Sequence, residues 1–169
     1  MPTINGRACV VNGKPVDKVY SNEKIVYGRN LLKGTFTSSF PKGANKEGTT
    51  MELIDGDDGE KYLHVVSAQR FGGMFIGAGQ IPSIMLPFKK YTVSADIKGD
   101  GAISFGFENA KPPVITLTSD WKRYSFSYEF GDRVNSIIWY GAADFYVRLV
   151  KLESGTIATD WTPAPEDVM

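Results

Sequence analysis

The sequence has very few of the side chains from which many catalytic and metal sites are built. A single cysteine, Cys9, excludes an intramolecular disulfide and any zinc site made of several cysteines. A single histidine, His64, excludes metal sites with several histidine ligands and most histidine-dependent catalytic schemes. The chain has no G-x-S-x-G, H-E-x-x-H or P-loop motif, and no motif singles out a catalytic pair among its 19 acidic residues. We therefore do not expect an enzyme.

A surplus of charge and long apolar runs are also absent. The 19 basic residues equal the 19 acidic ones, which argues against a nucleic-acid-binding protein because such proteins carry basic patches. No apolar run approaches the roughly 20 residues that span a bilayer, so we expect no membrane insertion. Residues 1–6 lack the basic and apolar regions of a secretory signal peptide, and we expect synthesis in a cytoplasm without export by that route.

The residues that are abundant favour strands and turns. Glycine, proline and aromatic residues are frequent, and helix-favouring runs are scarce. Residues 91–98 alternate with period two, with Tyr91 and Val93 on one face and Thr92 and Ser94 on the other, as in a half-buried strand. Short strands separated by turn signals predict an all-β chain, folded as an antiparallel β-sandwich. The predicted strands are residues 31–36, 51–54, 61–66, 71–76, 84–86, 91–98, 103–107, 114–117, 122–130, 134–140 and 145–152, with a loop at 37–49 and a turn at 99–101.

Residues 1–29 differ from the rest and form a first segment, ahead of a domain at residues 30–169. The segment holds short β-prone runs separated by turns, of which Asn12-Gly13 is a strong hairpin signal. So small a β-hairpin or meander buries little on its own. We expect it to pack on the sandwich, on a neighbouring copy or on an adjoining protein; the alternative is a flexible leader. The β-prone runs are residues 8–11, 18–20 and 24–27.

The stretch at residues 144–167 closes the domain. It reads DFYVRLVKLESGTIATDWTPAPED: a strand, a turn, and then Trp161 shortly before prolines that cannot continue a ladder, so we expect Trp161 to anchor the terminus. The part KLESGTIATDWTPAPED resembles the closing signature of jelly-roll carbohydrate-binding modules in tail and baseplate (receptor-binding) proteins of phages that infect Gram-positive bacteria. YGRNLL at residues 27–32 resembles the opening strand of such modules, and DWKRY at residues 120–124 resembles a middle part.

The resemblance implies a jelly-roll domain that binds saccharide on the host cell wall without catalysis. It also implies a place in the virion, in a phage tail or baseplate, where many copies act together. The implied partners are cell-surface polysaccharide and other phage tail or baseplate proteins. The alternative function is that of a purely structural decoration or connector protein of the virion, whose sandwich makes protein contacts only.

Cofactors are not expected, with one position left open. Related jelly-roll modules often hold a structural calcium between their first and last strands. By analogy, Glu153 or Asp160 near Asn30 would contribute, but no ligand set is assigned. The acidic turn at residues 55–58 is interpreted as a solvated hairpin turn, because it lacks the spacing of an EF-hand loop.

Tryptophans are the first candidates for contact with a sugar ring. Alternation sends Trp139 and Tyr140 to opposite faces of one strand, so that one of the pair faces away from the core and offers a stacking surface. Trp139 is the residue of the pair that we predict in the site. Trp121 and Trp161 lie in the framework motifs, and we interpret both as core or latch residues.

The polar faces of three predicted strands provide the other candidates. If residues 91–98, 122–130 and 145–152 lie side by side, one surface carries planar side chains for a sugar ring and charged groups for pairs of hydroxyls. Arg70 and His64 are expected at the rim of that surface. The alternative is an ordinary solvated sheet face. The candidate carbohydrate-binding residues are Trp139, Tyr146, Arg148, Arg123, Asp96, Arg70 and His64.

Overall fold

The computed structural model describes residues 7–81, 90–131 and 135–169, and strands joined by turns make up this part of the chain. It contains no α-helix, and hence no helix with the length and apolar character that a membrane crossing requires. The all-β fold class is confirmed. Its short 3₁₀ helices are η1 (Asp57–Gly59), η2 (Ala78–Gln80) and η3 (Pro165–Asp167). The strands are β1 (Val10–Val11), β2 (Lys14–Pro15), β3 (Lys18–Ser21), β4 (Lys24–Gly28), β5 (Gly43–Asn45), β6 (Thr50–Asp55), β7 (Lys61–Ser67), β8 (Gly73–Ile76), β9 (Lys90–Phe107), β10 (Val114–Thr116), β11 (Lys122–Glu129), β12 (Ile137–Tyr140) and β13 (Ala143–Ser154).

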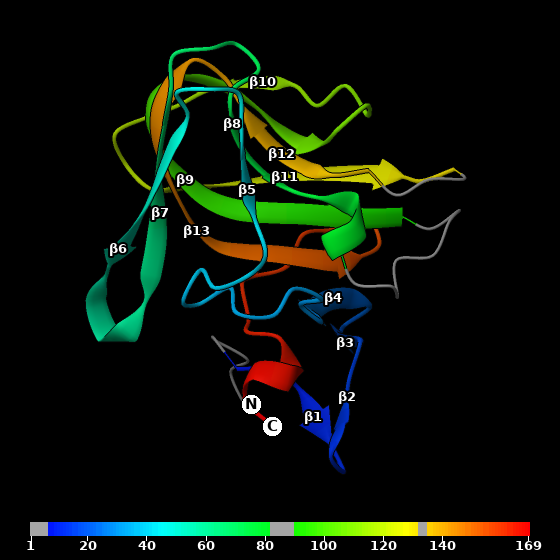
Figure 1. Ribbon diagram of the computed structural model, residues 1–169. Coiled ribbons are helices and arrows are strands. Elements are labelled where there is room, and N and C mark those ends of the chain that lie inside the picture. The colour runs from blue at the N-terminus through cyan, green and yellow to red at the C-terminus, as the bar shows by residue number, and fades with distance from the viewer. Residues whose placement is uncertain (1–6, 82–89, 132–134) are drawn as a thin grey trace.

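Strands β5 to β13 form two layers that share the long strand β9 (Figure 1). The first layer has the order β11-β9-β13-β7-β6. The second layer has the order β10-β9-β12-β8-β5. All of these pairs are antiparallel, and β9 contributes its first half to one layer and its second half to the other. The predicted antiparallel sandwich is confirmed, with its two layers joined through β9.

The bend in β9 lies at Gly99 and Gly101, between the two layers. Their φ angles of 153° and 101° lie in a region that other residues rarely adopt. A Cβ atom at Gly99 would lie 2.3 Å from the carbonyl oxygen of Asp144 on the neighbouring strand β13. Glycine therefore lets the strand bend without a break in its pairing. The prediction of a turn at residues 99–101 is wrong for this reason.

The core lies between the layers and is built from the faces that alternation predicted to point inward. Each large apolar side chain removed from water contributes roughly 1.5–3 kcal/mol, so this shared interior is what holds the layers together. Phe107 of the second layer contacts Phe126 of the first, with 6.3 Å between ring centroids. Fully buried core residues of β9 are Val93, Ala95, Ile97, Ile103 and Phe107.

Trp139 lies in this core and not on the surface. Its side chain is fully buried, and its ring centroid lies 5.2 Å from that of Phe105. It shares the inward side of β12 with Ile137, which is also fully buried. Tyr140 is the partly exposed member of the pair. The prediction of Trp139 as a stacking surface for a ligand is therefore wrong, because no part of its ring reaches solvent.

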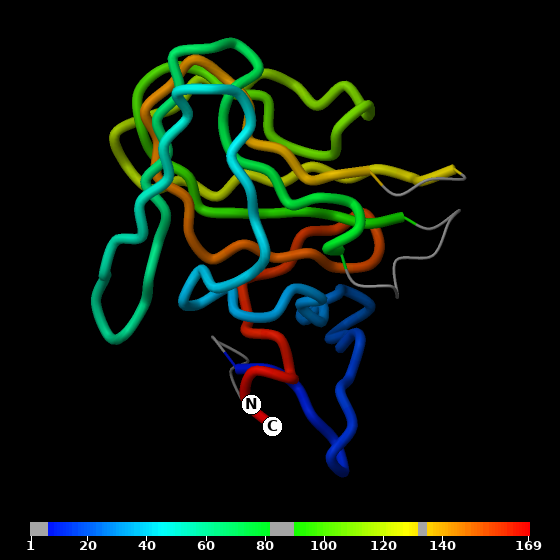
Figure 2. Tube along the Cα trace, in the orientation of Figure 1, coloured from blue at the N-terminus to red at the C-terminus, as the bar shows by residue number. Residues whose placement is uncertain are grey.

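The described part of the N-terminal segment, residues 7–29, contains two hairpins at one end of the sandwich (Figure 2). β1 pairs with β2 across Asn12-Gly13, and β3 pairs with β4 across Asn22-Glu23. All of these turn residues have positive φ, as tight hairpin turns require. The backbone N–H of Gly28, at the end of β4, donates to Thr159 Oγ1 at 3.1 Å, and Tyr27 is buried. The β3–β4 hairpin therefore packs on the sandwich, while the division at residue 29 stays a prediction.

Residues 31–36, predicted as the opening strand, form turns instead. The backbone reverses at Gly34, whose φ is 69°. The buried Asn30 amide fixes these turns, because its Nδ2 atom donates to the carbonyl oxygens of Val150 (3.2 Å) and Thr162 (3.0 Å). One side chain thus joins the turns to β13 and to the C-terminal segment.

Other segments agree with the sequence patterns to different degrees. The strands predicted at residues 51–54, 61–66 and 145–152 are found as β6, β7 and β13, with ends shifted by a few residues. Residues 43–45 form β5, although the loop predicted at 37–49 includes them. The strand predicted at residues 84–86 and the start of the one at 134–140 lie outside the described residues.

Trp161 anchors the C-terminal segment as predicted. Its indole Nε1–H donates to Thr35 Oγ1 at 3.1 Å, and its ring stacks on Phe36 with 5.8 Å between centroids. Pro163 and Pro165 beyond it are buried, and η3 follows. The terminus is therefore held against the turns at residues 31–36.

Replacement of Trp139 tests its place in the core. We expect Trp139→Ala to lower the free energy of unfolding by about 3–5 kcal/mol, the usual cost of deleting a large buried aromatic side chain. Trp139→Phe should cost much less, because it keeps a ring and removes an indole Nε1–H that has no hydrogen-bond partner among the described residues. Urea denaturation followed by circular dichroism measures both. Unfolding free energies unchanged in both variants would contradict the burial.

Candidate functional site

The outward face of the first layer brings together most of the residues predicted to bind a saccharide. β11 and β13 both pair with β9, and the register places Arg123 opposite Asp96 and Asp96 opposite Arg148. On the other side of β13, Tyr146 lies opposite His64 of β7. Directly opposed residues on neighbouring antiparallel strands project to the same face, so these five side chains share one surface.

We call this surface the polar sheet face. It also includes further residues on the same strands and residues in the turns that precede β7 and β11. These additional side chains contact the predicted ones, as described below. The polar sheet face consists of Glu60, Tyr62, His64, Asp96, Lys98, Trp121, Arg123, Asp144, Tyr146 and Arg148.

A β-bulge in β13 sets the limit of the polar sheet face. Between Arg148 and Lys151 the strand carries one more residue than β9 does, and Leu149 adopts a φ of 49°. The carbonyl oxygen of Leu149 accepts a hydrogen bond from Arg123 Nη1 at 3.1 Å. The extra residue breaks the predicted alternation, so that Val150 is buried in the core in place of Leu149. It also turns Lys151 to the same side as Arg148.

The arginines of the polar sheet face are held by carboxylates. Arg123 donates from Nη1 to Asp96 Oδ1 and from Nη2 to Ser94 Oγ, both at 2.9 Å. Arg148 Nη1 lies 3.1 Å from Glu60 Oε2, and its Nε lies 3.5 Å from Asp96 Oδ2. Exposed ion pairs contribute little stability, and these half-buried ones act mainly by fixing the conformations of both arginines.

Aromatic rings form a row across the same face. Trp121 and Tyr62 meet edge to face, with 5.6 Å between centroids and 80° between planes. Tyr62 and Tyr146 do the same at 6.0 Å and 65°. His64 then stacks on Tyr146 at 4.3 Å and 7°, and its Nε2 atom lies 2.7 Å from Asp144 Oδ1. All four rings are partly exposed, so the row can be reached from solvent.

Two cations lie over these rings. The guanidinium carbon of Arg148 is 4.3 Å from the centroid of Trp121. The Lys98 ammonium is 4.8 Å from Trp121 and 5.2 Å from Tyr146, and it has no ion pair within the described part of the chain. Such cation–π contacts hold the rings in place. Beside them lies a depression of about 440 Å³, lined by Lys98, Gly99, Asp100, Ser119, Asp144 and Tyr146.

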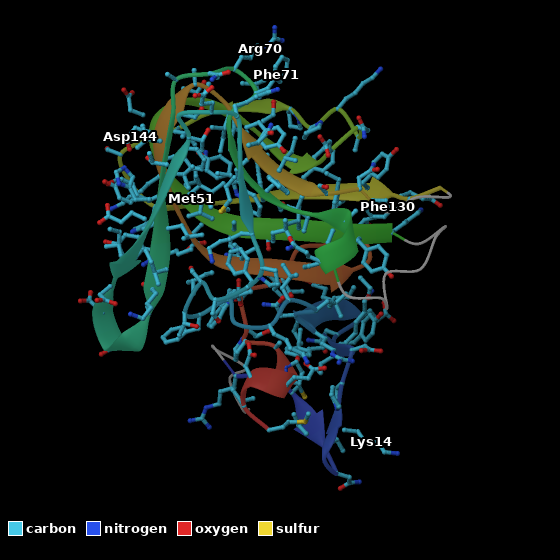
Figure 3. All side chains as sticks on the ribbon, viewed as in Figure 1. Lys14, Met51, Arg70, Phe71, Phe130 and Asp144 are labelled. Atoms are coloured by element: carbon cyan, nitrogen blue, oxygen red, sulfur yellow. The ribbon has the colours of Figure 1, made fainter. Side chains whose placement is uncertain are left out.

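The structure separates the predicted site residues into two groups. It brings Asp96, Arg123, Arg148, Tyr146 and His64 together on the polar sheet face, and His64 lies within the aromatic row instead of at the rim. Trp139 is buried in the core. Arg70 lies on the loop after β7, where its guanidinium carbon is 5.1 Å from the ring centroid of Phe71, and Figure 3 shows both residues at one end of the molecule. Arg70 is not part of the polar sheet face.

Sequence reasoning missed five members of the polar sheet face, namely Glu60, Tyr62, Lys98, Trp121 and Asp144. Trp121 was assigned to the framework because it lies in the DWKRY motif, yet its ring lies against Arg148 and Lys98. Tyr62 lies two residues before His64 on β7, so their alternation was the signal that could have placed both on this face. Lys98 follows the same rule relative to Asp96 on β9.

Beyond the bulge, the same side of β13 is covered by the C-terminal segment. The fully buried Lys151 ammonium donates to Thr159 Oγ1 (2.8 Å) and to the carbonyl oxygen of Asp160 (2.7 Å), and it lies 3.5 Å from Glu153 Oε2. Thr159 in turn donates from its backbone N–H and its hydroxyl to the Glu153 carboxylate. Burial lowers the pKa of Lys151 from 10.5 to about 8, against the opposing attraction of Glu153.

This cluster bears on the calcium that the resemblance implied near Asn30. A carboxylate oxygen of Glu153 and the backbone carbonyl oxygen of Asp160 contact the ammonium group of Lys151. No group of three or more histidine, cysteine, aspartate or glutamate side chains that could hold a metal ion occurs among the described residues. The acidic residues at 55–58 form the hairpin turn between β6 and β7, with η1 in it, as interpreted.

Comparison with known proteins gives matches at the level of structure only. No protein-family model matches the sequence, and no curated protein matches it. One similar structure is the family 22 carbohydrate-binding module and catalytic module of endo-1,4-β-D-xylanase 10B from Clostridium thermocellum, complexed with xylohexaose (TM-score 0.57, 14% identity). The match covers 78% of this chain and 30% of that one, so this chain spans less than a third of that protein.

Two further similar structures consist of carbohydrate-binding modules alone. The tandem family 22 modules of Xyn10C from Paenibacillus barcinonensis match with a TM-score of 0.53 and 12% identity, over 78% of this chain and 47% of that one. The C-terminal family 22 module of Clostridium thermocellum Xyn10B matches with a TM-score of 0.50 and 13% identity, over 79% and 97%. The chain has the fold of these modules. The predicted jelly-roll fold is thereby confirmed, and the low identity limits the similarity to the fold.

The buried lysine gives the stability a defined pH dependence. Between pH 8 and pH 10.5 the unfolded chain binds a proton on Lys151 that the folded chain has lost, so the free energy of unfolding should rise with pH across this range. Urea denaturation should show this rise in the natural chain and not in a Lys151→Met, Glu153→Gln double variant, which leaves no buried charge. Lys14→Met, at an exposed hairpin turn, is the control and should keep the rise. Parallel pH profiles for the natural chain and the double variant would contradict the assignment.

Proposed function

We propose that this chain is a non-catalytic module of a phage tail or baseplate that binds saccharide on the cell wall of a Gram-positive host. The observation that carries the proposal is the polar sheet face, where an accessible row of aromatic rings lies beside arginines and carboxylates of fixed conformation.

The polar sheet face offers both kinds of contact that a sugar ring requires. The C–H surface of a pyranose is apolar and packs on aromatic side chains, and the partly exposed Trp121 and Tyr146 offer such contacts on this face. Vicinal hydroxyls pair with the two oxygens of a carboxylate or the two nitrogens of a guanidinium, as Asp96 and Arg148 present them. Because the ion pairs already hold these side chains, a ligand orders few of them on binding, which reduces the entropic cost.

The structural comparison supports saccharide as the class of ligand. The xylanase module with a similar fold is described in complex with xylohexaose, a linear oligosaccharide. Fold similarity does not by itself carry function, since function depends on the site. In this chain the site has the side chains that saccharide recognition needs, and it lies on an uncovered sheet face.

The phage setting rests on the sequence. KLESGTIATDWTPAPED resembles the closing signature of modules in phage tail and baseplate proteins, and the proposal places the chain in the virion on that ground. Single saccharide sites bind weakly, because polar groups exchange water for ligand at small net gain. A multimeric particle offsets this weakness, since many linked copies bind far more tightly than one.

The N-terminal hairpins are proposed as the attachment to other tail or baseplate proteins. They expose large apolar side chains: Val11 is 56% exposed, Tyr20 60% and Val26 43%. The same observation favours the second candidate function, a purely structural connector that uses only protein contacts. The two candidates differ in whether the polar sheet face binds glycan.

Removal of single rings tests the polar sheet face. We expect Trp121→Ala and Tyr146→Ala each to weaken binding to purified Gram-positive cell-wall polysaccharide about tenfold, the equivalent of about 1.4 kcal/mol, through loss of ring stacking. Tyr20→Ala removes an exposed aromatic ring from a hairpin and should bind like the natural chain. Isothermal titration calorimetry and pull-down of fluorescently labelled cells measure the effect, and circular dichroism checks that each variant is folded.

The same experiments distinguish the candidate functions. A natural chain that binds no cell or polysaccharide, even as a multivalent fusion, would refute the saccharide proposal and favour the connector. Binding that survives both ring deletions would remove the polar sheet face from the site. Release of reducing ends from the polysaccharide would contradict the non-catalytic assignment.

A further inference from the structure

A second depression lies across the bend of β9 from the polar sheet face. It measures about 350 Å³, and its walls come from the second layer and from the loop after β7. None of its lining residues belongs to the polar sheet face. The lining residues are Arg70, Phe71, Ala102, Ser104, Val114, Tyr140, Gly141 and Ala142.

The apolar part of this depression is unusually exposed. Phe71 is 58% exposed and Val114 is 68% exposed, although both are large hydrophobic side chains. The Phe71 loop is nevertheless fixed, because the Phe71 carbonyl oxygen accepts a hydrogen bond from Asn45 Nδ2 at 2.6 Å. The next residue, Gly72, accepts one from the backbone N–H of Gly141 at 2.9 Å. A rigid loop therefore holds an aromatic ring in solvent.

Polar groups without partners line the same depression. The Arg70 guanidinium lies 5.1 Å from the centroid of Phe71, and it forms no ion pair or hydrogen bond within the described residues. No hydrogen bond joins the hydroxyls of Ser104 and Tyr140 to other groups in the described part of the chain. Burial, with a smaller effect from Glu108, raises the pKa of Tyr140 to about 12, so its hydroxyl remains a donor at neutral pH.

We propose that this depression is a second saccharide subsite, in which a pyranose ring packs on Phe71 and its hydroxyls bind Arg70, Ser104 and Tyr140. The mixture of a planar apolar ring with unpartnered donors is the same chemistry as on the polar sheet face, provided here by different residues. The inference goes beyond the proposed function, because it assigns a separate site and requires no phage setting.

The size of the patch favours a sugar ring over a protein partner. A stable protein interface buries about 800 Å² on each side, whereas here the exposed large apolar side chains are Phe71 and Val114. A depression of about 350 Å³ is at the small end of the range for small-ligand pockets. One or two sugar units therefore fit the site better than a protein surface does.

The two depressions are lined by neighbouring residues of the same strand, β9. β9 contributes Lys98 and Asp100 to the first depression and Ala102 and Ser104 to the second, on either side of Gly101. Strands advance about 3.3 Å per residue, so neighbouring lining positions are separated by less than the length of a short oligosaccharide. One glycan chain that occupies both subsites gains affinity from the linkage.

Nuclear magnetic resonance of the ¹⁵N-labelled full chain tests the subsite directly. The probes are xylohexaose, cellohexaose, chitohexaose and solubilised Gram-positive cell-wall polysaccharide, titrated separately. The amide signals of Gly72 and Gly141 report on the second depression, and the Trp121 indole signal reports on the polar sheet face. We expect saturable shifts at Gly72 and Gly141 with at least one probe. Phe71→Ala should weaken that binding about tenfold, while Tyr20→Ala should leave it unchanged.

Each outcome separates this inference from the proposed function. Shifts confined to the Trp121 indole overturn the second subsite and leave the proposed function in place. Shifts confined to Gly72 and Gly141, lost in Phe71→Ala and kept in Tyr146→Ala, support the second subsite and refute the polar sheet face. No saturable shift at either position, with any probe, overturns both.

Discussion

The extra residue at Leu149 determines what the outer side of the first layer carries. Without it, Arg148 and Lys151 would point to opposite faces of β13; with it, both point outward. The hydrogen bond from Arg123 to the Leu149 carbonyl oxygen holds the bulge, and the same guanidinium binds Asp96. On the same face of β13, this one backbone irregularity therefore separates an open, charged surface before the bulge from a closed, buried cluster after it. Bulges occur frequently next to functional sites for this reason.

The closed side is built around polar contacts. Lys151, Glu153 and Thr159 form a buried cluster that holds the C-terminal segment on β13, and the Asn30 amide joins the same segment to the first turns of the domain. A buried ion pair adds little net stability, because desolvation of the two charges offsets their attraction. Its contribution is specific geometry, because the hydrogen bonds of Lys151, Glu153 and Thr159 hold the terminus in this position on the sheet. Trp161 then supplies the apolar contact that completes the closure.

Period-two alternation allowed the fold class and much of the polar sheet face to be predicted. It placed Asp96, Arg123, Arg148 and Tyr146 on outward faces, and strand pairing then brought them together. It could not show which face of β12 is inward, so Trp139 was placed on the wrong side. The bulge at Leu149 and the bend of β9 escaped detection because both depend on contacts between distant strands. Arg70 was misplaced for a similar reason, since sequence proximity to a strand does not define which end of the sandwich its loop reaches.

The hairpins and the Arg70–Phe71 loop lie at opposite ends of the molecule, as the positions of Lys14 and Phe71 show in Figure 3. The two ends of the domain therefore differ: one carries the hairpins and the other carries the Arg70–Phe71 loop. A protein that bound only the hairpins would leave the Arg70–Phe71 loop and the polar sheet face accessible. If several copies were attached to one surface through their hairpins, their Arg70–Phe71 loops would all lie at the free ends and face the same direction.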